Sequence, residues 1–310
     1  MAISKLVLYG SYMVDSSHTL LIGVDGGGTG CRAAVGTLAD GILARAEGGR
    51  ANVSSDPELA IKNVIATVAA AAATCGISNE RLTSATAHLG LAGVMTAQDA
   101  QKVASAVPYH QVTVTDDRPT ALNGALGGQD GFLLSVGTGT IAAARTDGIF
   151  RSVGGWGFHL SDQASGSWLG QECLRHVLLC HDGMVQHTEL TRALFANFQN
   201  DPNEVVAFSI SAKPGDYGTF APDVIEGARA NDPVGQLIMR AGADYLQQCL
   251  NVLGLKAGDA LCLTGGVGPH YSDYLPSDVT SGLQAHKGNA LDGAFNFARA
   301  NFKKNLEALL

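Results

Sequence analysis

The sequence predicts an α/β protein built from two similar domains. Apolar strand-like runs end in glycine-rich turns at three widely separated places, residues 20–30, 131–140 and 260–268. Helix-start patterns fall between these runs, and strands that alternate with helices indicate helices layered on β-sheets. The recurrence of one strand-and-turn unit at such distances is typical of a duplicated domain, in which each copy presents a turn to a shared cleft.

Length and composition agree with this class. The chain has 310 residues, of which 46% are hydrophobic and 15% charged, which is enough for two domains. Its net charge of −8 argues against a general nucleic-acid-binding protein. The six cysteines are scattered and form no C-x-x-C pair, so reduced core thiols in a cytoplasmic protein are expected. No apolar run reaches the roughly 18 residues of a membrane span, so no membrane partner is expected.

The residues before Leu20 are expected to be an extension. Their apolar run, residues 5–9, is too short for the core of a signal peptide, and no clear cleavage site follows it. Met13 is an alternative natural start.

The first strand, residues 20–24, runs directly into a turn made of Asp25, Gly26, Gly27, Gly28 and Thr29. Glycine N–H groups can line an anion-binding concavity with no side chain in the way. The carboxylate of Asp25 stands where a metal ion bound to phosphate would need an oxygen ligand. The alternative is an ordinary tight turn, which needs one or two glycines rather than three behind an acid. The turn therefore predicts a phosphate site with Asp25 as its metal ligand.

Two other phosphate-binding loops are excluded. The Walker loop requires Gly-Lys-Ser or Gly-Lys-Thr, and the chain contains no Gly-Lys pair. Gly26 and Gly28 fit the start of the dinucleotide pattern, but Cys31 stands at its third glycine, and a strand follows in place of a helix.

Helix-start signals divide the rest of the chain. An aspartate followed by proline begins a helix at Asp56 and again at Asp232, because the first residue caps the helix and the second fits its first turn. Gly76 is placed to end the first of these helices. A further helix is expected over residues 163–179.

Strands are also expected at residues 85–91 and 112–115, and the second runs into Asp116 and Asp117. Carboxylates at the carboxyl end of a strand are where α/β folds place their sites. Asp116 is the candidate that takes a proton from a substrate hydroxyl. Asp117 is expected to cap the helix over residues 119–126.

The strand-and-turn unit recurs twice in the second half of the chain. Strands over residues 131–136 and 141–145 flank one turn, and a strand over residues 260–264 precedes the other. Each turn offers main-chain N–H groups to an anion, as the first turn does. The residues of these turns that could contact a ligand are Gly137, Thr138, Gly139, Gly265 and Gly266.

A polar, glycine-rich region lies between these turns, at residues 154–166, and includes Gly155, Trp156 and Asp162. An aromatic ring beside an acid is suited to a sugar, because the ring stacks on apolar C–H faces and the carboxylate accepts hydroxyl protons. The alternative for Asp162 is a helix N-cap, and the sequence leaves both open.

Together, the three turns and the 154–166 region resemble the actin-like ATPase and sugar kinase superfamily. Within it they resemble the BadF/BadG/BcrA/BcrD-type ATPase family, which includes glucosamine kinases and N-acetylglucosamine kinases. The resemblance covers about residues 20–299 and implies two ribonuclease H-like (actin-like ATPase) domains around an interdomain cleft. The acids and the proline near residue 117 place the domains at 1–117 and 118–291. The C-terminal helix, residues 292–310, is a candidate to pack back on the first.

The resemblance implies a role for each motif. Asp116 matches the catalytic aspartate, and Asp25 matches the acid near Mg²⁺. The first two turns would hold the phosphates of ATP, and Gly265 and Gly266 would border its adenosine. The positions that would meet the sugar are Asn52, Asp116, Gly155, Trp156 and Asp162.

The implied activity is transfer of the γ-phosphoryl group of MgATP to the C6 hydroxyl of an amino sugar, glucosamine or N-acetylglucosamine. The family often has Asp-Glu-Gly-Ser where this chain has Asp162, Gln163, Ala164 and Ser165, which leaves the choice of sugar open. The form found here, together with residues 216–220, looks closer to the bacterial glucosamine kinases.

The same fold leaves alternatives without sugar kinase activity. One is an ATPase that activates a radical dehydratase through an iron–sulfur cluster, for which clustered cysteines would be expected. Another is a sugar-binding regulator, for which a basic N-terminal DNA-binding helix pair would be expected. A homodimer is left open.

Overall fold

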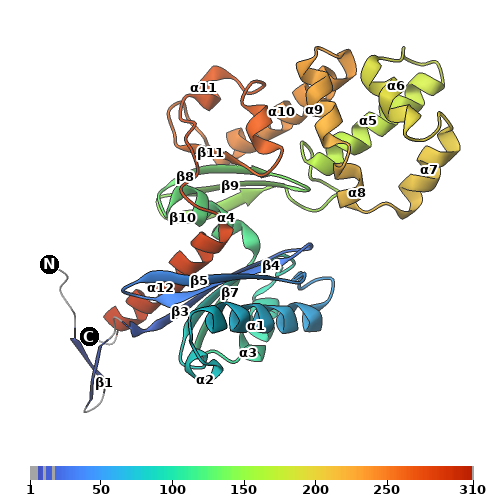
Figure 1. The fold of residues 1–310 in the computed structure, drawn as a ribbon. Coiled ribbons are helices and arrows are strands. Elements are labelled where there is room, and N and C mark those ends of the chain that lie inside the picture. Colours follow the sequence, from blue (N-terminus) through green and yellow to red (C-terminus); the bar gives the residue numbers. More distant parts are fainter. Residues whose placement is uncertain (1–5, 10–11, 16–17, 309–310) are drawn as a thin grey trace. The chain divides into compact units, whose positions relative to one another are not determined.

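The structure, a computed structural model, describes residues 6–9, 12–15 and 18–308 (Figure 1). Contacts along the chain separate two compact units. Unit 1 comprises residues 1–129 and 287–310, and unit 2 comprises residues 130–286. The chain therefore leaves unit 1 once and later returns to it.

The expected extension before Leu20 falls partly outside the described residues. Its described backbone forms two short strands, β1 (Leu6–Tyr9) and β2 (Tyr12–Asp15), which pair with each other in antiparallel fashion. The alternative start at Met13 stays a prediction.

The core of unit 1 is a five-stranded sheet. In spatial order its strands are β5 (Gly41–Gly48), β4 (Cys31–Thr37), β3 (Leu20–Gly26), β6 (Thr86–Leu91) and β7 (Gln111–Thr115). The pairs β5–β4 and β4–β3 are antiparallel, whereas β3, β6 and β7 run parallel. The carboxyl ends of the three parallel strands therefore meet at one edge of the sheet, where Asp25 and Asp116 lie.

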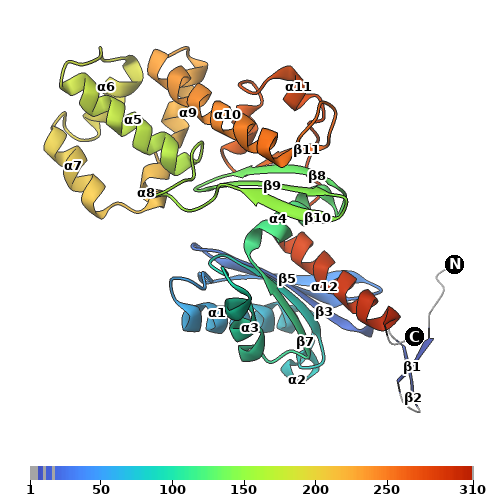
Figure 2. The ribbon, with the colours of Figure 1, turned by 180° about the vertical axis from the view of Figure 1, so that it is seen from behind.

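Helices cover both faces of this sheet (Figures 1 and 2). Ile22 and Val24 of β3 point into a core shared with α1, whereas Leu21 packs with Phe295 of α12. Because both faces are covered, β3 has no polar side chain before Asp25, near its carboxyl end. The helices of unit 1 are α1 (Pro57–Thr74), α2 (Asn79–Leu82), α3 (Ala97–Ala106), α4 (Asp117–Leu126) and α12 (Ala290–Glu307).

Helix α12 meets α4 and β3 backbone to backbone. A methyl group added at Gly124 of α4 would lie 1.8 Å from the main-chain oxygen of Asn289, and one added at Gly293 of α12 would lie 2.0 Å from that of Thr120. A methyl group at Gly23 of β3 would lie 2.5 Å from the nitrogen of Phe295 in α12. No side chain fits at these three positions, so glycine is what allows α12 to pack this closely on α4 and β3.

Because α4 packs with α12, the boundary between the units follows residue 129 and not residue 117 as the sequence suggested. The main-chain nitrogen of Lys287 donates to the oxygen of Ala125 at 2.8 Å, so the chain returns to unit 1 beside the place where it left.

Unit 2 repeats four of the five strands in the sheet of unit 1. Its sheet has the spatial order β10 (Ile149–Val153), β9 (Thr140–Thr146), β8 (Gly131–Val136) and β11 (Leu261–Thr264). The pairs β10–β9 and β9–β8 are antiparallel and β8–β11 is parallel, as in β5–β4–β3–β6. The turn between β8 and β9 therefore corresponds to the turn between β3 and β4, and the predicted duplication of an α/β domain is confirmed.

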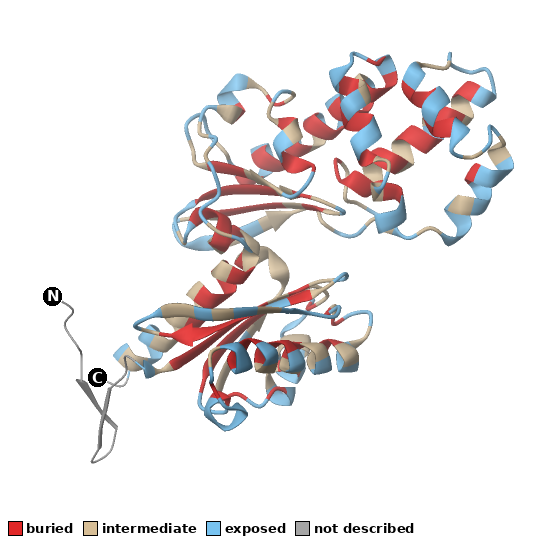
Figure 3. Ribbon diagram, in the orientation of Figure 1, coloured by how far each residue is buried: buried red, intermediate tan, exposed pale blue. Residues whose placement is uncertain are grey.

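Most of the remaining chain of unit 2 is helical. Its buried side chains gather along α5, α9 and α10 and on the sheet (Figure 3). No helix in the described residues is both long enough and apolar enough to cross a membrane. The helices are α5 (Gly166–His181), α6 (Glu189–Ala196), α7 (Pro202–Ser211), α8 (Pro214–Gly218), α9 (Ala221–Arg229), α10 (Pro233–Leu253), the 3₁₀ helix η2 (Gly268–Tyr271) and α11 (Ser277–Thr280).

The predicted helix starts at the aspartate–proline pairs are confirmed. Asp56 and Asp232 accept hydrogen bonds from main-chain N–H groups in the first turns of α1 and α10. Gly76 follows α1 with a φ of 70°, a conformation that favours glycine. The helix expected from residue 163 begins later, because Ser165 caps α5 by accepting from the Trp168 nitrogen at 3.1 Å.

The Gly293→Ala variant tests the contact between α12 and α4. The added methyl group would collide with the main-chain oxygen of Thr120, and main chain cannot move aside as a flexible side chain can. We expect the free energy of unfolding to fall by about 2–4 kcal/mol in urea titrations. Gly215→Ala is the control, because nothing lies within 4 Å of a methyl group at that helical glycine. Equal stability of the two variants would contradict the close packing.

A second prediction concerns His88 of β6, whose side chain is 3% exposed. Burial lowers its pKa from 6.5 to about 4. Between these two pH values the unfolded chain binds a proton at His88 and the folded chain does not. The neutral imidazole therefore contributes fully to the free energy of unfolding above about pH 6.5, and this contribution is lost as the pH falls toward 4.

Other groups titrate in the same range, so the test compares wild type with His88→Gln. We expect the difference in unfolding free energy between the two to change by about 3 kcal/mol from pH 7 to pH 4. Urea unfolding at several pH values measures it. Parallel pH profiles for the two proteins would show that His88 is not the group responsible.

Candidate active site

The first glycine turn is held from two sides. The nitrogen of Ala51, after β5, donates to the oxygen of Gly27 at 2.9 Å, and that of Ala92, after β6, donates to Gly26 at 2.8 Å. A methyl group at Gly26 would lie 2.6 Å from the Leu91 side chain, so Gly26 packs tightly. Nothing lies within 4 Å of one at Gly28. The turn therefore has a rigid base and an open tip, where main-chain N–H groups can meet an anion.

Asp25 lies opposite Arg32 in the β3–β4 pair. Both of its hydrogen bonds from Arg32 end on the same oxygen, Oδ2, with Nε at 3.1 Å and Nη2 closer. No described residue donates to Oδ1. One oxygen of the carboxylate is therefore held and the other is available, which fits a residue that supplies a single ligand to a metal ion.

Asp116 caps α4. Its Oδ1 accepts from the Arg118 nitrogen and from Arg118 Nε, both at 2.9 Å, and its Oδ2 accepts from Arg118 Nη2 at 3.1 Å. The expectation that Asp117 caps this helix was wrong. The helix begins at Asp117 itself, immediately after β7, so the capping position falls on Asp116. Arg118, which the sequence did not single out, fixes the orientation of the Asp116 carboxylate through a two-point contact.

Asp117 is the buried member of an acidic group at this edge of the sheet. Burial, and to a smaller extent the nearby carboxylates of Asp116 and Asp25, raises its pKa to about 6. Carboxylates crowded in this way favour a cation among them. In the described part of the chain no group of three or more His, Cys, Asp or Glu side chains could hold a metal ion by itself. Mg²⁺ commonly takes one or two carboxylates and completes its shell with phosphate oxygens and water, so Asp25 fits it.

Asn52 lies directly after Ala51, whose nitrogen holds the first glycine turn. Its Oδ1 accepts from the nitrogen and hydroxyl of Ser54, at 3.0 and 2.8 Å, and from the nitrogen of Ser55 at 3.2 Å. No described residue accepts from its Nδ2. The amide is therefore fixed by its oxygen and has its donor end free for a hydroxyl group.

The second glycine turn is held against the start of α5. The nitrogen of Gly166 donates to Gly137 at 2.7 Å, and the Ser167 hydroxyl donates to the oxygen of Thr138 at 2.7 Å. A further bond, from Gly137 to Gly139 at 2.9 Å, closes the turn. The positive end of the α5 dipole therefore lies at this turn and favours a bound anion.

The third turn joins the second at the end of β8. Gly265 has a φ of 82°, and a methyl group there would lie 2.3 Å from the oxygen of Val136, so glycine is required. Val267 donates to the same oxygen at 3.0 Å. This contact brings the two turns to the wall of one cavity of about 510 Å³, which Gly137, Thr138 and Gly266 help to line. The volume is in the range of sites that hold small organic ligands.

The sequence did not identify most of the other walls of this cavity. They come from the start of α5, from α8 and α9, and from the third turn and η2. Four of them lie in segments that the sequence had marked, but none of them was predicted as a contact. The residues missed are Gly166, Gly215, Gly218, Thr219, Ala221, Pro222, Ile225, Glu226, Val267 and His270.

Asp162 lies beside the second turn. A methyl group at Gly139 would lie 2.9 Å from its Oδ2, so Gly139 leaves room for the carboxylate. Burial raises the pKa of Asp162, although hydrogen bonds from the main chain of Thr140 and Gly157 act in the opposite direction. Its alternative role as a helix cap is wrong, because Ser165 caps α5.

Ala164 has a main-chain conformation that is unusual for alanine. Its φ is 71°, in the left-handed region that disfavours alanine, and its side chain is fully buried. The Tyr271 hydroxyl donates to its oxygen at 2.8 Å and helps to hold this conformation.

Trp156 is 68% exposed, an unusual state for so large an apolar ring. It follows Gly155, whose φ of 68° turns the chain before it. The ring is therefore available for stacking on a ligand.

The predicted residues fall into two groups, one in each unit. The group of unit 1 comprises Asp25, Gly26, Gly27, Gly28, Thr29, Asn52 and Asp116. The group of unit 2 comprises Gly137, Thr138, Gly139, Gly155, Trp156, Asp162, Gly265 and Gly266.

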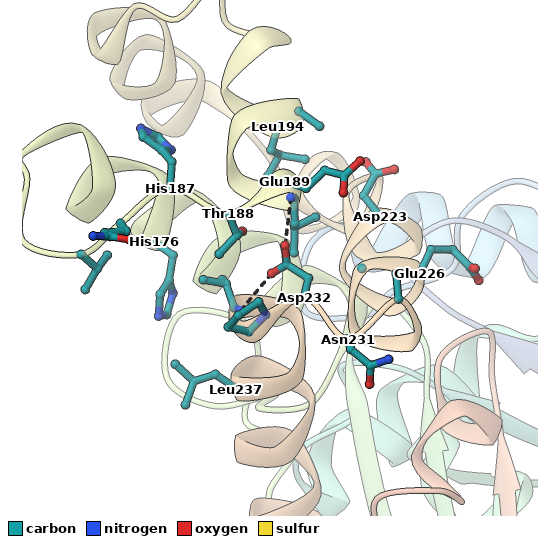
Figure 4. A pocket seen from close by; sticks show the side chains of 18 of the residues that line it. His176, His187, Thr188, Glu189, Leu194, Asp223, Glu226, Asn231, Asp232 and Leu237 are labelled. Atoms are coloured by element: carbon teal, nitrogen blue, oxygen red, sulfur yellow. Dashed lines mark hydrogen bonds between the residues drawn. The ribbon is translucent and has the colours of Figure 1, made fainter.

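A larger cavity of about 1060 Å³ lies among the helices of unit 2 (Figure 4). None of the predicted residues lines it. Its most buried acid is Asp232, which accepts hydrogen bonds from the nitrogens of Leu190 at 3.1 Å and Val234 at 2.9 Å. This carboxylate therefore serves to join α6 to the start of α10 and is not free for chemistry.

The chain is similar in sequence to known proteins. Residues 22–275 match the BadF/BadG/BcrA/BcrD ATPase family. The chain is 31% identical to a glucosamine kinase, GspK, of Vibrio cholerae over 283 residues, which cover 89% of this chain and 95% of the relative. It is 30% identical to an N-acetyl-D-glucosamine kinase of Dictyostelium discoideum over 191 residues, 58% of this chain and 60% of the relative.

A solved structure is similar over nearly the whole chain. It is a provisionally assigned N-acetylglucosamine kinase from Chromobacterium violaceum, with a TM-score of 0.83 and 33% identity, covering 91% of this chain and 99% of that one.

Proposed function

The chain belongs to the BadF/BadG/BcrA/BcrD ATPase family, and from this membership we propose that it is an ATP-dependent kinase that phosphorylates the C6 hydroxyl of an amino sugar. Its fold is that of the actin-like ATPases and sugar kinases. The observation that carries the proposal is the carboxylate of Asp116, held in a fixed orientation at the same sheet edge as the open glycine turn after Asp25.

The proposed nucleotide site rests on the 510 Å³ cavity of unit 2. ATP would lie with its base and ribose in this cavity and its phosphates on the turn Gly137–Thr138–Gly139, whose anion affinity the start of α5 increases. In unit 1, the turn Gly26–Gly27–Gly28 is the second proposed phosphate-binding turn. Mg²⁺, held through Asp25 Oδ1, would neutralise charge on the phosphates.

The proposed reaction is an in-line displacement. The C6 oxygen of the sugar forms a bond to the γ-phosphorus while the bond from that phosphorus to the β–γ bridging oxygen breaks, and ADP leaves. The hydroxyl proton passes to the carboxylate of Asp116 late in the step. Because the transition state is loose, the main tasks of the protein are positioning and charge stabilisation, and Arg118 serves the first by fixing the direction of the carboxylate.

Three residues are proposed to contact the sugar. Asn52 offers its free Nδ2, Trp156 its exposed ring and Asp162 its carboxylate. The Vibrio cholerae relative, which aligns over most of both chains, supports glucosamine as the preferred sugar. The residues Gln163 and Ala164 stand at the position where the choice between an amine and an acetamide is expected to be made.

An ADP-release assay with glucosamine, N-acetylglucosamine, N-acetylmannosamine and glucose tests the function. We expect turnover with an amino sugar, highest with glucosamine, and formation of the 6-phosphate. Absence of ADP release with all four sugars would refute the proposal. Turnover with glucose alone would refute the amino-sugar preference.

The Asp116→Asn variant tests the role of the carboxylate. Asparagine also caps helices, so the fold should be retained while the proton acceptor is lost. We expect kcat to fall by about 10²- to 10⁴-fold and the dissociation constant of ATP to change by less than about threefold. Asp201→Asn is the matched control, because Asp201 caps α7 by accepting from the nitrogen of Asn203, two residues on as in Asp116, and is not one of the proposed site residues. Near-normal turnover of Asp116→Asn would remove this assignment.

A further inference from the structure

His88 is the buried member of a hydrogen-bond network that joins α12 to β6 and β7. It is paired across the sheet with Thr113 of β7, and the ring of Phe297 from α12 packs on it with the centroids 4.8 Å apart. The described groups that contact its ring are threonine hydroxyls and this phenyl ring, and none is charged. The imidazole is therefore neutral near pH 7, with one nitrogen that donates and one that accepts.

The first half of the network fixes which nitrogen accepts. Asn301 Nδ2 of α12 can only donate, and it lies 2.7 Å from the hydroxyl oxygen of Thr113. The hydrogen of Thr113 can then go to His88 Nδ1 at 2.8 Å or to the oxygen of Ala87 at 3.4 Å. The shorter contact is the stronger bond, so Nδ1 accepts and the ring proton resides on Nε2.

The second half of the network leads to the proposed active site. His88 Nε2 lies 3.3 Å from the hydroxyl oxygen of Thr115 and donates to it. The Thr115 hydroxyl in turn donates to the main-chain oxygen of Asp116 at 2.8 Å. Every donor in the network thus points in one direction, from α12 through the sheet to the peptide group of Asp116.

We infer that His88 is a positioning residue for Asp116, because it links a helix-anchored hydrogen-bond chain to the main-chain oxygen of that residue. The inference rests on the proposed function, in which Asp116 accepts the proton of the sugar hydroxyl. Arg118 holds the carboxylate of Asp116, and the chain through His88 and Thr115 holds its peptide group. Together the two contacts restrict both ends of the residue.

The opposite ends of the same strands provide a matched link without this function. There the Thr86 hydroxyl of β6 donates to Gln111 Oε1 of β7 at 3.3 Å, and Asn305 of α12 donates to the same oxygen at 3.1 Å. This second link also ties α12 to β6 and β7, but it ends far along the strands from Asp116. Breaking it should affect stability and leave the active site in place.

The kinetic test compares three variants in the ADP-release assay. His88→Met fills the buried position with an apolar side chain and removes the Nε2–H donor. We expect kcat to fall about tenfold, with the KM values for ATP and sugar within about twofold of wild type. His88→Gln keeps an N–H donor of similar reach and should retain kcat within about threefold. Thr86→Val should match wild type in kcat. If His88→Met does not fold, Thr115→Val breaks the last link and should show the same loss.

A measurement without substrate separates this inference from the proposed function. Long-range ¹H–¹⁵N NMR spectra of the ligand-free protein should show His88 protonated on Nε2. The amide resonance of Asp117, which belongs to the same peptide group as the Asp116 oxygen, should shift from its wild-type position in His88→Met and remain there in Thr86→Val. Protonation on Nδ1 or an unmoved Asp117 amide would overturn the inference even in an active enzyme.

Unchanged kcat in His88→Met, or an equal loss in Thr86→Val, would overturn it as well. A wild type without turnover would refute the kinase proposal, whereas the NMR result would still decide whether His88 positions Asp116.

Discussion

The backbone contact of α12 with α4 and β3 is the constraint on which much of this structure depends. Gly23, Gly124 and Gly293 allow main chain to approach main chain, and the resulting interface joins residues from both ends of the sequence into unit 1. It buries one face of β3 and covers His88. It also fixes the places where the chain leaves for unit 2 and returns. The end of β7, and with it Asp116, is therefore supported by a helix that lies more than 160 residues later in the chain.

The two units use one topology for related purposes. In each, a glycine turn joins the first two strands of the sheet, and a segment after the next parallel strand braces that turn. The surroundings then diverge. In unit 1 the turn stands next to three carboxylates, at Asp25, Asp116 and Asp117. In unit 2 it stands next to one carboxylate, Asp162, the start of α5 and a cavity. Duplication thus accounts for the shared strand order and turns of the two units. The different neighbours of the turns account for their different proposed roles, phosphoryl transfer in unit 1 and nucleotide binding in unit 2.

Several residues of the site were predictable because their signal is local. The three glycine turns, the strand that ends at Asp116 and the polar region with Asp162 are each visible within a few residues. The error at Asp116 and Asp117 was also local: either acid can cap a helix, and only the position of the first helical residue decides between them. Arg118, His270 and Glu226 could not be found in this way, because their partners or neighbours are brought to them by folding.

The sequence by itself determined the family, the α/β class and the repeated strand-and-turn unit, and it supplied the candidate residues of the two groups, since these depend on short patterns of glycine, apolar and acidic residues. Tertiary structure decided where unit 1 ends, because α4 belongs to the unit against which it packs. It also decided the cavity walls of unit 2 and the hydrogen-bond chain from Asn301 to Asp116. Those features depend on contacts between segments distant in sequence, and no local pattern encodes such contacts.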